Sequence, residues 1–288
     1  MNEPWAGDIY SDPTLLLPGQ AGLKNLMPLY NDTSSVIRTV DPNHIIFYEP
    51  VTWGMIFNGS ILGSGFDTVP GGADWAHKSV YSFHYYCWWY NGENPSDMIK
   101  KTCDQVFGPK VLNQVARDIH RTGGSAMLTE WGQGCDPYDA NSTSECIAIM
   151  DNCDKHFMSW SSWYFGYQVM NNDWVIPDES LTVFARTYAR RIAGNPISTQ
   201  YDSTTQEFKL CYEPTTPSKE SVNGLNAVSE IFYHSRLHYP LRVSVHVSPQ
   251  LEVISTDNDL ILVRNRFLSA EEKLKLPSVA CVTVTAKA

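Results

Sequence analysis

Three short apolar segments of this chain end in side chains that can carry charge or exchange a proton. Glu49 closes HIIFYEP, His84 and Tyr86 close SVYSFHYY, and Glu130 lies near the end of SAMLTEWG. A fourth acid, Glu3, stands in MNEPWAGD in the setting of another strand end. If these segments are parallel strands of a barrel, their carboxyl ends meet at one mouth. The side chains are therefore candidates for a single site.

Two carboxylates that face each other provide the chemistry for breaking a glycosidic bond. One stays protonated and gives its proton to the leaving oxygen, while the other stays ionised and attacks the anomeric carbon. The segment from Glu3 to Glu130 has room for three to four β/α units of roughly 30 to 40 residues, so the two acids can face each other across a barrel mouth. We predict them as the catalytic pair, with His84 and Tyr86 beside them. Glu49 stays outside the set, as a supporting acid or salt-bridge partner.

The elements that must position these groups alternate between strand and helix. The predicted strands cover 44–50, 79–86, 125–132 and 157–165, and the predicted helices cover 23–40, 95–122, 143–156 and 180–194. This alternation predicts an α/β fold with a parallel sheet, either a barrel or a doubly wound sheet. No glycine-rich phosphate loop follows any of the strands, which argues against the nucleotide-binding form of the doubly wound fold.

The pattern changes after Asn195-Pro196. Apolar and polar residues alternate in five later segments: EFKLCYE, RVSVHVS, LEVIST, LILVRN and VACVTVTAKA. Turn residues separate these segments, as expected for antiparallel strands. We predict an α/β domain over residues 1–195 and a small all-β sandwich over residues 196–288.

Several motifs resemble one enzyme family when they are taken in order. NEP, FHYY, LTEWG and SWSSW resemble glycoside hydrolase family 5, a family of retaining (β/α)8-barrel enzymes. NEPWAGD, IIFYEPVTWG and FARTYARRIAGNP followed by a β-domain resemble its endoglycoceramidase branch. Enzymes of that branch cut the β-linkage between the glycan and the ceramide of glycosphingolipids. The resemblance runs from residue 2 to about 200 and continues more loosely into the β-domain.

The resemblance implies a role for each matching residue. Glu3 matches the acid/base of the family and Glu130 its nucleophile. His84 and Tyr86 match the His-x-Tyr pair, with Tyr86 expected to contact the nucleophile. These are the residues that the strand ends also indicate.

Two further substrate contacts follow from the resemblance alone. Asn2 matches the asparagine that hydrogen-bonds the sugar 2-hydroxyl, and Trp163, the second tryptophan of SWSSW, matches the sugar-stacking platform. The sequence holds nine tryptophans and fifteen tyrosines. Aromatic side chains near acids suit a cleft that stacks on sugar rings, although packing in the core is the alternative for Trp163.

The sequence departs from the family in the number of strands. A complete barrel has eight strands, and this chain supplies the last four and the tip of another. The resemblance therefore implies that the first four strands, roughly 100 to 150 residues, lie upstream of Met1. We expect the C-terminal half of a (β/α)8 TIM barrel followed by the β-sandwich. Because half a barrel has two open sheet edges, we expect this chain alone to be poorly folded and inactive.

Charge and cysteine spacing limit the partners. The formal net charge is −10, and no basic stripe is present to neutralise phosphates, so nucleic acid is excluded. No Cys-x-x-Cys or Cys/His spacing indicates a zinc site, and no metal or other cofactor is predicted. The expected partner is a glycosphingolipid or a β-glycan, with peripheral contact with membrane lipid left open and no defined protein partner.

Seven cysteines and three sequons indicate an oxidising compartment. The sequons are Asn31-Asp-Thr, Asn58-Gly-Ser and Asn141-Ser-Thr. Cysteines and sequons together favour a secreted or lysosomal glycoprotein for the full-length parent. The first residues have neither the basic region nor the apolar core of a signal peptide.

Three functions remain open at this point. The first is hydrolysis of the glycan–ceramide linkage of glycosphingolipids. The second is a family 5 β-glucosidase or endoglucanase that acts on soluble β-glucans. The third is a non-catalytic relic that binds glycolipid through the cleft aromatics. The retention of both Glu3 and Glu130 argues against the third.

Overall fold

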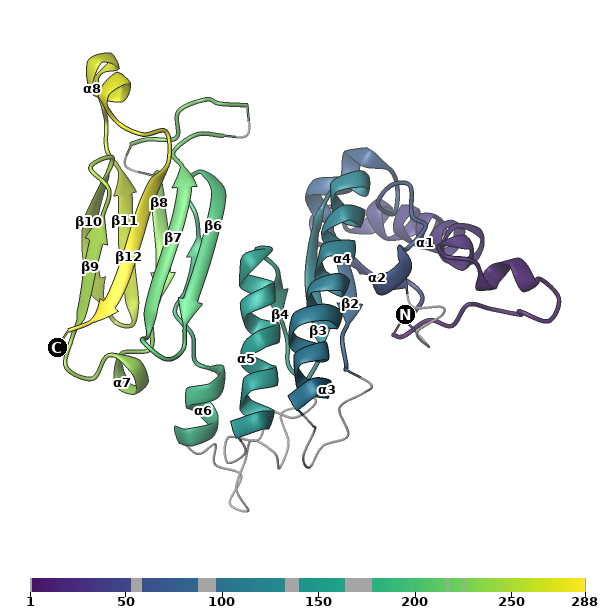
Figure 1. The fold of residues 1–288 in the computed structure, drawn as a ribbon. Coiled ribbons are helices and arrows are strands. Elements are labelled where there is room, and N and C mark those ends of the chain that lie inside the picture. The colour runs from purple at the N-terminus through teal and green to yellow at the C-terminus, as the bar shows by residue number, and fades with distance from the viewer. Residues whose placement is uncertain are drawn as a thin grey trace. The chain divides into compact units, whose positions relative to one another are not determined.

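The computed structural model describes residues 2–52, 59–87, 97–132, 140–163, 178–216, 218–224 and 226–287. The chain divides into two compact units, Met1–Gly166 and Tyr167–Ala288, which we call the α/β unit and the β-domain (Figure 1). Within the described ranges, no helix combines the length and the apolar character needed to cross a bilayer.

The sheet of the α/β unit consists of four parallel strands in the order β1-β2-β3-β4. The strands are β1 (Ile46–Tyr48), β2 (Ser79–His84), β3 (Ser125–Glu130) and β4 (Ser159–Trp160). Every residue of β2 is buried, as expected for a central parallel strand that is covered on both faces. All four predicted strands are confirmed. The first three are shorter than the sequence pattern suggested, and residues 164–165 of the fourth prediction lie outside the described residues.

Helices precede and connect these strands. They are α1 (Met27–Val40), α2 (Gly59–Leu62), α3 (Asp97–Thr102), α4 (Gly108–Thr122) and α5 (Ala140–Lys155). Shorter 3-10 and π-helical turns lie at Pro13–Leu16, Gly22–Leu26, Ala73–Lys78 and Cys103–Phe107. Figure 1 shows α4 and α5 side by side on one face of the sheet, and they contact β3 and β4 respectively. The apolar stripe of α4, formed by Val111, Leu112 and Val115, is buried.

The order of strands and helices is that of a (β/α)8 barrel, in which each parallel strand is followed by helical structure. The four described strands correspond to half of such a barrel. The prediction that four more strands precede Met1 stays a prediction, as does the prediction that the chain alone is poorly folded and inactive.

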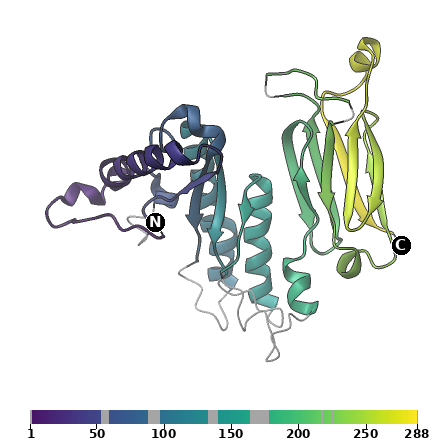
Figure 2. The same cartoon turned by 180° about the vertical axis from the view of Figure 1, so that it is seen from behind.

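The β-domain contains two four-stranded antiparallel sheets, ordered β10-β11-β8-β5 and β6-β7-β12-β9. Its strands are β5 (Tyr188–Arg191), β6 (Asn195–Asp202), β7 (Glu207–Glu213), β8 (Val228–Phe232), β9 (Val243–Val247), β10 (Leu251–Asp257), β11 (Leu260–Asn265) and β12 (Ala280–Ala286). The helices α6 (Asp178–Phe184), α7 (Ser235–His238) and α8 (Ala270–Lys275) complete it. Figures 1 and 2 show α8 at one end of the sheets and α7 at the other.

Both sheets contribute to one apolar core. Ile231 and Val263 come from the first sheet, and Leu210 and Val282 from the second, and all four are fully buried. On β12 the alternate residues 280, 282 and 284 are buried while their neighbours are partly exposed, which is the period-two pattern of a half-buried strand. The predicted all-β domain is therefore confirmed.

The predicted helix over 180–194 is wrong in its second half. Helix α6 ends at Phe184, and Tyr188–Arg191 form strand β5, which pairs with β8. The ring of Tyr188 lies 5.3 Å from that of Phe232, and strand pairing in the sheet overrides the weak helix preference of the segment. Because β5 belongs to the β-domain, the predicted boundary at 195/196 lies too late. The chain divides instead between Gly166 and Tyr167.

A disulfide joins the two central strands of the second sheet. Cys211 on β7 lies opposite Cys281 on β12, and the two are 70 positions apart in the sequence. Replacing both by valine is expected to lower the free energy of unfolding of the β-domain by about 2 to 5 kcal/mol, because the unfolded chain regains the freedom of a long loop. Hydrogen exchange at the amides of β7 and β12 measures the change.

A reductant serves as the control for this prediction. It should speed exchange in the parent β-domain but not in the double variant, because the other described disulfide, Cys87–Cys103, lies in the α/β unit. Equal exchange in the parent and the double variant would contradict the expected stabilisation.

Candidate active site

Two neighbouring strands end beside each other and deliver two of the predicted groups. His84, the last residue of β2, is paired in register with Glu130, the last residue of β3. The backbone N–H of Tyr85 donates to the carbonyl oxygen of Glu130 at 3.1 Å. The parallel sheet therefore holds the imidazole and the carboxyl group at the same mouth.

Glu3 reaches this mouth from a segment that has no regular secondary structure. Its Oε1 lies 2.9 Å from Nδ1 of His84. Its backbone N–H donates to Oε2 of Glu49 at 3.0 Å, and the N–H of Thr52 donates to the carbonyl oxygen of Pro4 at 3.1 Å. Glu3 has φ of +47°, in the left-handed region that few non-glycine residues adopt. Contacts with the segment after β1 thus hold the backbone that presents this acid.

Tyr86 contacts the predicted nucleophile. Its hydroxyl donates to Oε1 of Glu130 at 2.9 Å. Burial raises the pKa of Tyr86 well above its ordinary value, and the hydrogen bond to Glu130 and the charges of Glu130 and Glu3 raise it further. The phenol therefore keeps its proton and acts as a fixed donor toward the carboxylate.

The two predicted catalytic acids lie close together. Oxygen atoms of Glu3 and Glu130 and a ring nitrogen of His84 all lie within 4.8 Å of one another. Retaining glycosidases place their carboxyl groups about 5 to 5.5 Å apart, whereas inverting enzymes need about 6.5 to 9.5 Å to hold a water between them. The side chains of Glu3 and Glu130 are 25% and 16% exposed, so solvent reaches both. The upper limit of 4.8 Å between single oxygen atoms is compatible with the closer arrangement, in which one of the carboxylates attacks directly.

The same three side chains offer ligand atoms that a divalent cation accepts. Within the described structure, the Nδ1 atom of His84 already has Oε1 of Glu3 at hydrogen-bond distance. That contact uses the two groups as partners of each other and leaves Oε2 of Glu130 at 3.6 Å from the ring.

Glu49 has a larger part in the site than the sequence predicted. Its side chain is 5% exposed; Oε2 accepts from the N–H of Glu3, and Oε1 accepts from the hydroxyl of Thr52 at 2.8 Å. Oε1 also lies 3.6 Å from Nε2 of His84. The buried carboxyl thus contacts both the backbone of Glu3, the predicted acid/base, and the imidazole of His84. The sequence signal for this role was the position of Glu49 at the end of the apolar run HIIFYEP, directly before a proline.

The acid–base behaviour of Glu49 gives a stability prediction. Burial raises the pKa of its carboxyl above the ordinary value of 4.5, although His84 opposes the shift. The native state then holds a proton that the unfolded chain has lost. The free energy of unfolding of the α/β unit should therefore fall as the pH rises from 4.5 through the raised pKa.

Glu49→Gln is expected to remove this pH dependence, because the amide does not ionise and still offers one acceptor oxygen. Urea unfolding at a series of pH values measures the slope. Glu207→Gln is the matched control, since Glu207 is an exposed residue of the β-domain. A slope that persists in Glu49→Gln would contradict the assignment.

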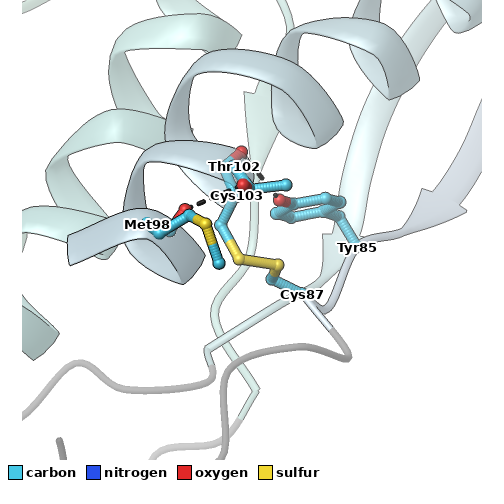
Figure 3. The surroundings of a disulfide bond; sticks show 5 residues. All are labelled: Tyr85, Cys87, Met98, Thr102 and Cys103. Carbon is cyan, nitrogen blue, oxygen red and sulfur yellow. Dashed lines mark hydrogen bonds between the residues drawn. A yellow bond between two sulfur atoms is a disulfide. The ribbon is translucent and has the colours of Figure 1, made fainter. Parts of the chain in front are cut away.

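A disulfide holds the chain that follows Tyr86. Cys87 is bonded to Cys103 in the π-helical turn before α4. Figure 3 shows the bond beside the ring of Tyr85, whose hydroxyl donates to the carbonyl oxygen of Cys103 at 3.3 Å. The end of the segment that carries Tyr86 is thereby tied to the helix layer.

The remaining predicted contacts, Asn2 and Trp163, are exposed. Asn2 directly precedes Glu3, and the side chain of Trp163 is 58% exposed. The backbone of Trp163 is held beside the end of β3, because its N–H donates to the carbonyl oxygen of Trp131. A Cβ on Gly132 would lie 2.1 Å from the carbonyl oxygen of Trp163, so glycine permits this close approach. Both residues are thus exposed to solvent.

Comparison with protein families agrees with this geometry. Residues 1–167 match the family described as cellulase (glycosyl hydrolase family 5). The chain belongs to glycoside hydrolase family 5. Residues 186–275 match the glycoside hydrolase family 5 C-terminal domain, which accounts for most of the β-domain. The family resemblance noted in the sequence motifs is confirmed.

Two curated relatives share the family 5 sequence over nearly the whole chain. An endoglycoceramidase of Hydra vulgaris is 32% identical over 290 residues, which cover 96% of this chain and 48% of the relative. An endoglycoceramidase of Cyanea nozakii is 31% identical over 295 residues, which cover 97% of this chain and 53% of the relative. The chain therefore spans about half the length of the curated relatives it matches.

A solved structure shows the same fold. Endo-glycoceramidase II from Rhodococcus sp., in its ganglioside GM3 complex, superimposes with a TM-score of 0.72 at 20% identity. The match covers 100% of this chain and 58% of that protein. The folds of the α/β unit and of the β-domain are therefore also present in that protein.

Proposed function

We propose that this chain carries the catalytic carboxylates of a retaining β-glycosidase that hydrolyses the glycan–ceramide linkage of glycosphingolipids. The observation that supports it most directly is the pair Glu3 and Glu130 at the strand ends of a family 5 fold, with oxygen atoms within 4.8 Å. This spacing favours a covalent mechanism with net retention.

In the first step Glu130 attacks the anomeric carbon of the sugar that is linked to the lipid. Glu3 donates a proton to the glycosidic oxygen as the bond to the anomeric carbon breaks, and the alcohol of the lipid leaves. The product is a glycosyl ester of Glu130. The hydroxyl of Tyr86, 2.9 Å from Oε1 of Glu130, orients the carboxylate for the attack.

In the second step water replaces the enzyme at the anomeric carbon. Glu3, now ionised, takes a proton from the water as the water attacks, and Glu130 leaves as a carboxylate. His84 lies 2.9 Å from Glu3 and 3.6 Å from Glu130, so it fixes the acid/base relative to the nucleophile. Each step uses only these side chains and water.

The choice of substrate is supported by the relatives. Both curated relatives are named endoglycoceramidases, and the Rhodococcus protein was solved with ganglioside GM3. The rival is hydrolysis of a soluble β-glucan, because the family match is described as cellulase. The two proposals differ in the group that leaves, a lipid alcohol or a sugar hydroxyl.

The deciding experiment offers both substrates to one protein. Because a barrel of this family needs eight strands, we define the completed chain as residues 2–288 joined to four further β/α units taken from an endoglycoceramidase relative. We expect the completed chain to release an intact glycan from a glycosylceramide in the presence of a chelator. We expect little hydrolysis of a cellooligosaccharide. Preference for the cellooligosaccharide would replace the proposal with its rival, and binding of glycolipid without turnover would favour a non-catalytic relic.

The disulfide bonds support an oxidising compartment as the location of this activity. Cys87 is bonded to Cys103 and Cys211 to Cys281, and Cys146 is also disulfide-bonded. Such bonds persist in secreted and other oxidising environments. As part of the proposal, we place the full-length protein outside the cell or in the lysosome. Thiol titration of the protein isolated from its native source would test this.

A further inference from the structure

The β-domain contains a cavity that the proposed catalytic function does not use. Its volume is about 300 Å³, at the lower end of the range in which proteins bind small molecules. Two segments form most of its wall: residues 213–223, which follow β7, and residues 266–278, which include α8. Figure 1 shows α8 at the end of the sheets where this cavity lies.

The walls of the cavity are held by local hydrogen bonds. Thr215 and Ser221 form a β-bridge that closes the loop after β7. Ser269 caps α8 in a capping box with Glu272. The cavity therefore has a defined shape in the absence of a ligand.

Two buried polar atoms in this wall have no hydrogen-bond partner within the described structure. Gln250 is 4% exposed; its Nε2 donates to the carbonyl oxygen of Pro277 at 2.7 Å, but its Oε1 has no donor. The Oγ1 atom of Thr215 is likewise buried and unsatisfied. A buried acceptor without a donor is unfavourable, so a ligand with an N–H or O–H group would gain by binding here.

The cavity is positively charged on a chain whose formal net charge is −10. Its wall carries Lys219, Arg266 and Lys273 against a single carboxylate, Glu213, which pairs with Lys219. Arg266 donates to the carbonyl oxygen of Pro249, and Lys273 to the hydroxyl of Ser221. In the described part of the chain neither forms an ion pair within 4 Å. Arg266 and Lys273 can therefore form an ion pair with an anionic group of a ligand.

The carboxylates near Arg266 and Lys273 belong to α8. Glu272 is near enough to Arg266 for the guanidinium to contribute to a lowered pKa of its carboxyl, but the capping hydrogen bonds with Ser269 are the larger cause. Glu271 is paired with Lys275. Both carboxylates of α8 are thus already committed, and an incoming anion would not have to displace them.

The rest of the wall is aliphatic. Val222, Leu268 and Leu276 line the cavity, and no aromatic side chain is among its described lining residues. Neutral sugars are usually held by stacking on aromatic rings, so this wall does not suit them. A ligand that carries a carboxylate beside hydroxyl or amide donors matches both the cations and the unsatisfied acceptors.

We propose that this cavity is a binding site for an acidic sugar, with its carboxylate held by Arg266 and Lys273 and a hydroxyl or amide N–H donated to Gln250. The inference goes beyond the proposed hydrolysis, because it gives the β-domain a glycan site of its own. It needs no turnover, so its test can succeed or fail whether or not the chain is an active glycosidase.

The test is a titration of the completed chain with the methyl α-glycoside of N-acetylneuraminic acid, monitored by ligand-observed NMR. The methyl ester of the same sugar is the neutral control, and inorganic phosphate is the anion without a sugar. We expect saturable binding of the acid, at least about tenfold weaker binding of the ester, and weaker binding of phosphate, because charge-assisted hydrogen bonds are stronger than neutral ones.

Variants of α8 locate the site. Lys273→Gln is expected to weaken binding at least about tenfold. Lys275→Gln is the matched control, because Lys275 lies two positions along the same helix and does not line the cavity. Both side chains are exposed, so neither change disturbs the core. Equal binding of acid and ester, equal binding of phosphate, or equal effects of the two variants would each overturn the proposal.

Discussion

Glu130→Gln is expected to reduce hydrolysis of a glycosylceramide by the completed chain by at least about a thousandfold, because the covalent step loses its nucleophile. The amide is nearly isosteric and still accepts the hydrogen bond that the hydroxyl of Tyr86 now makes with Oε1. The variant should therefore keep its fold and its affinity for substrate. The loss is expected in kcat, with KM changed little.

A covalent trap identifies the nucleophile independently of the rate. A 2-deoxy-2-fluoro glycoside slows breakdown of the glycosyl ester, and mass spectrometry of the digested protein should find the sugar on the peptide that contains Glu130. Glu207→Gln, a change of the same type at an exposed site in the β-domain, should label and react like the parent. Labelling of another residue would refute the assignment of Glu130.

Glu3→Ala is expected to slow cleavage of a glycosylceramide by about 10²- to 10⁴-fold, since the lipid alkoxide is a poor leaving group without a proton. A dinitrophenyl glycoside needs no such proton, so the formation of its glycosyl ester should be affected far less. The later attack by water still lacks its base. Azide, which needs no deprotonation, should restore turnover and give a glycosyl azide of retained configuration.

The pattern of substrates and rescue separates a catalytic role from a structural one. Loss of the contact between Glu3 and His84 at 2.9 Å would lower the rates for both substrates alike if it acted only through the fold. Unchanged urea unfolding of the variant would exclude a general loss of stability. A uniform loss without azide rescue would contradict the acid/base assignment of Glu3.

The strand ends were the most informative part of the sequence. Glu130, His84 and Tyr86 follow short apolar runs, and parallel strands of that kind bring their carboxyl ends together. Their proximity could therefore be predicted before any distance was known. The register of His84 with Glu130 and the hydrogen bond from Tyr86 agree with that prediction.

Other features depended on contacts between distant segments. The segment that contains Tyr188 has alanines and arginines that suit a helix, yet it pairs with β8, which lies some 40 positions later in the chain. The acidity and position of Glu49 likewise depend on its burial among Thr52, His84 and the backbone of Glu3. Helix propensity and the periodicity of apolar residues depend on residues that are neighbours along the chain. They therefore carry no information on either of these contacts between distant segments.

The sequence by itself determined the family, the α/β and all-β order of the domains, and the residues that end three of the barrel strands. Those features follow from local pattern and from residue type. The tertiary structure alone decided that Glu3 lies beside His84 in a left-handed backbone conformation, that Glu49 supports both, and that β5 is a strand. The tertiary structure also forms the cavity that Gln250 lines. These depend on burial and on distances between residues far apart in the chain, which only folding fixes.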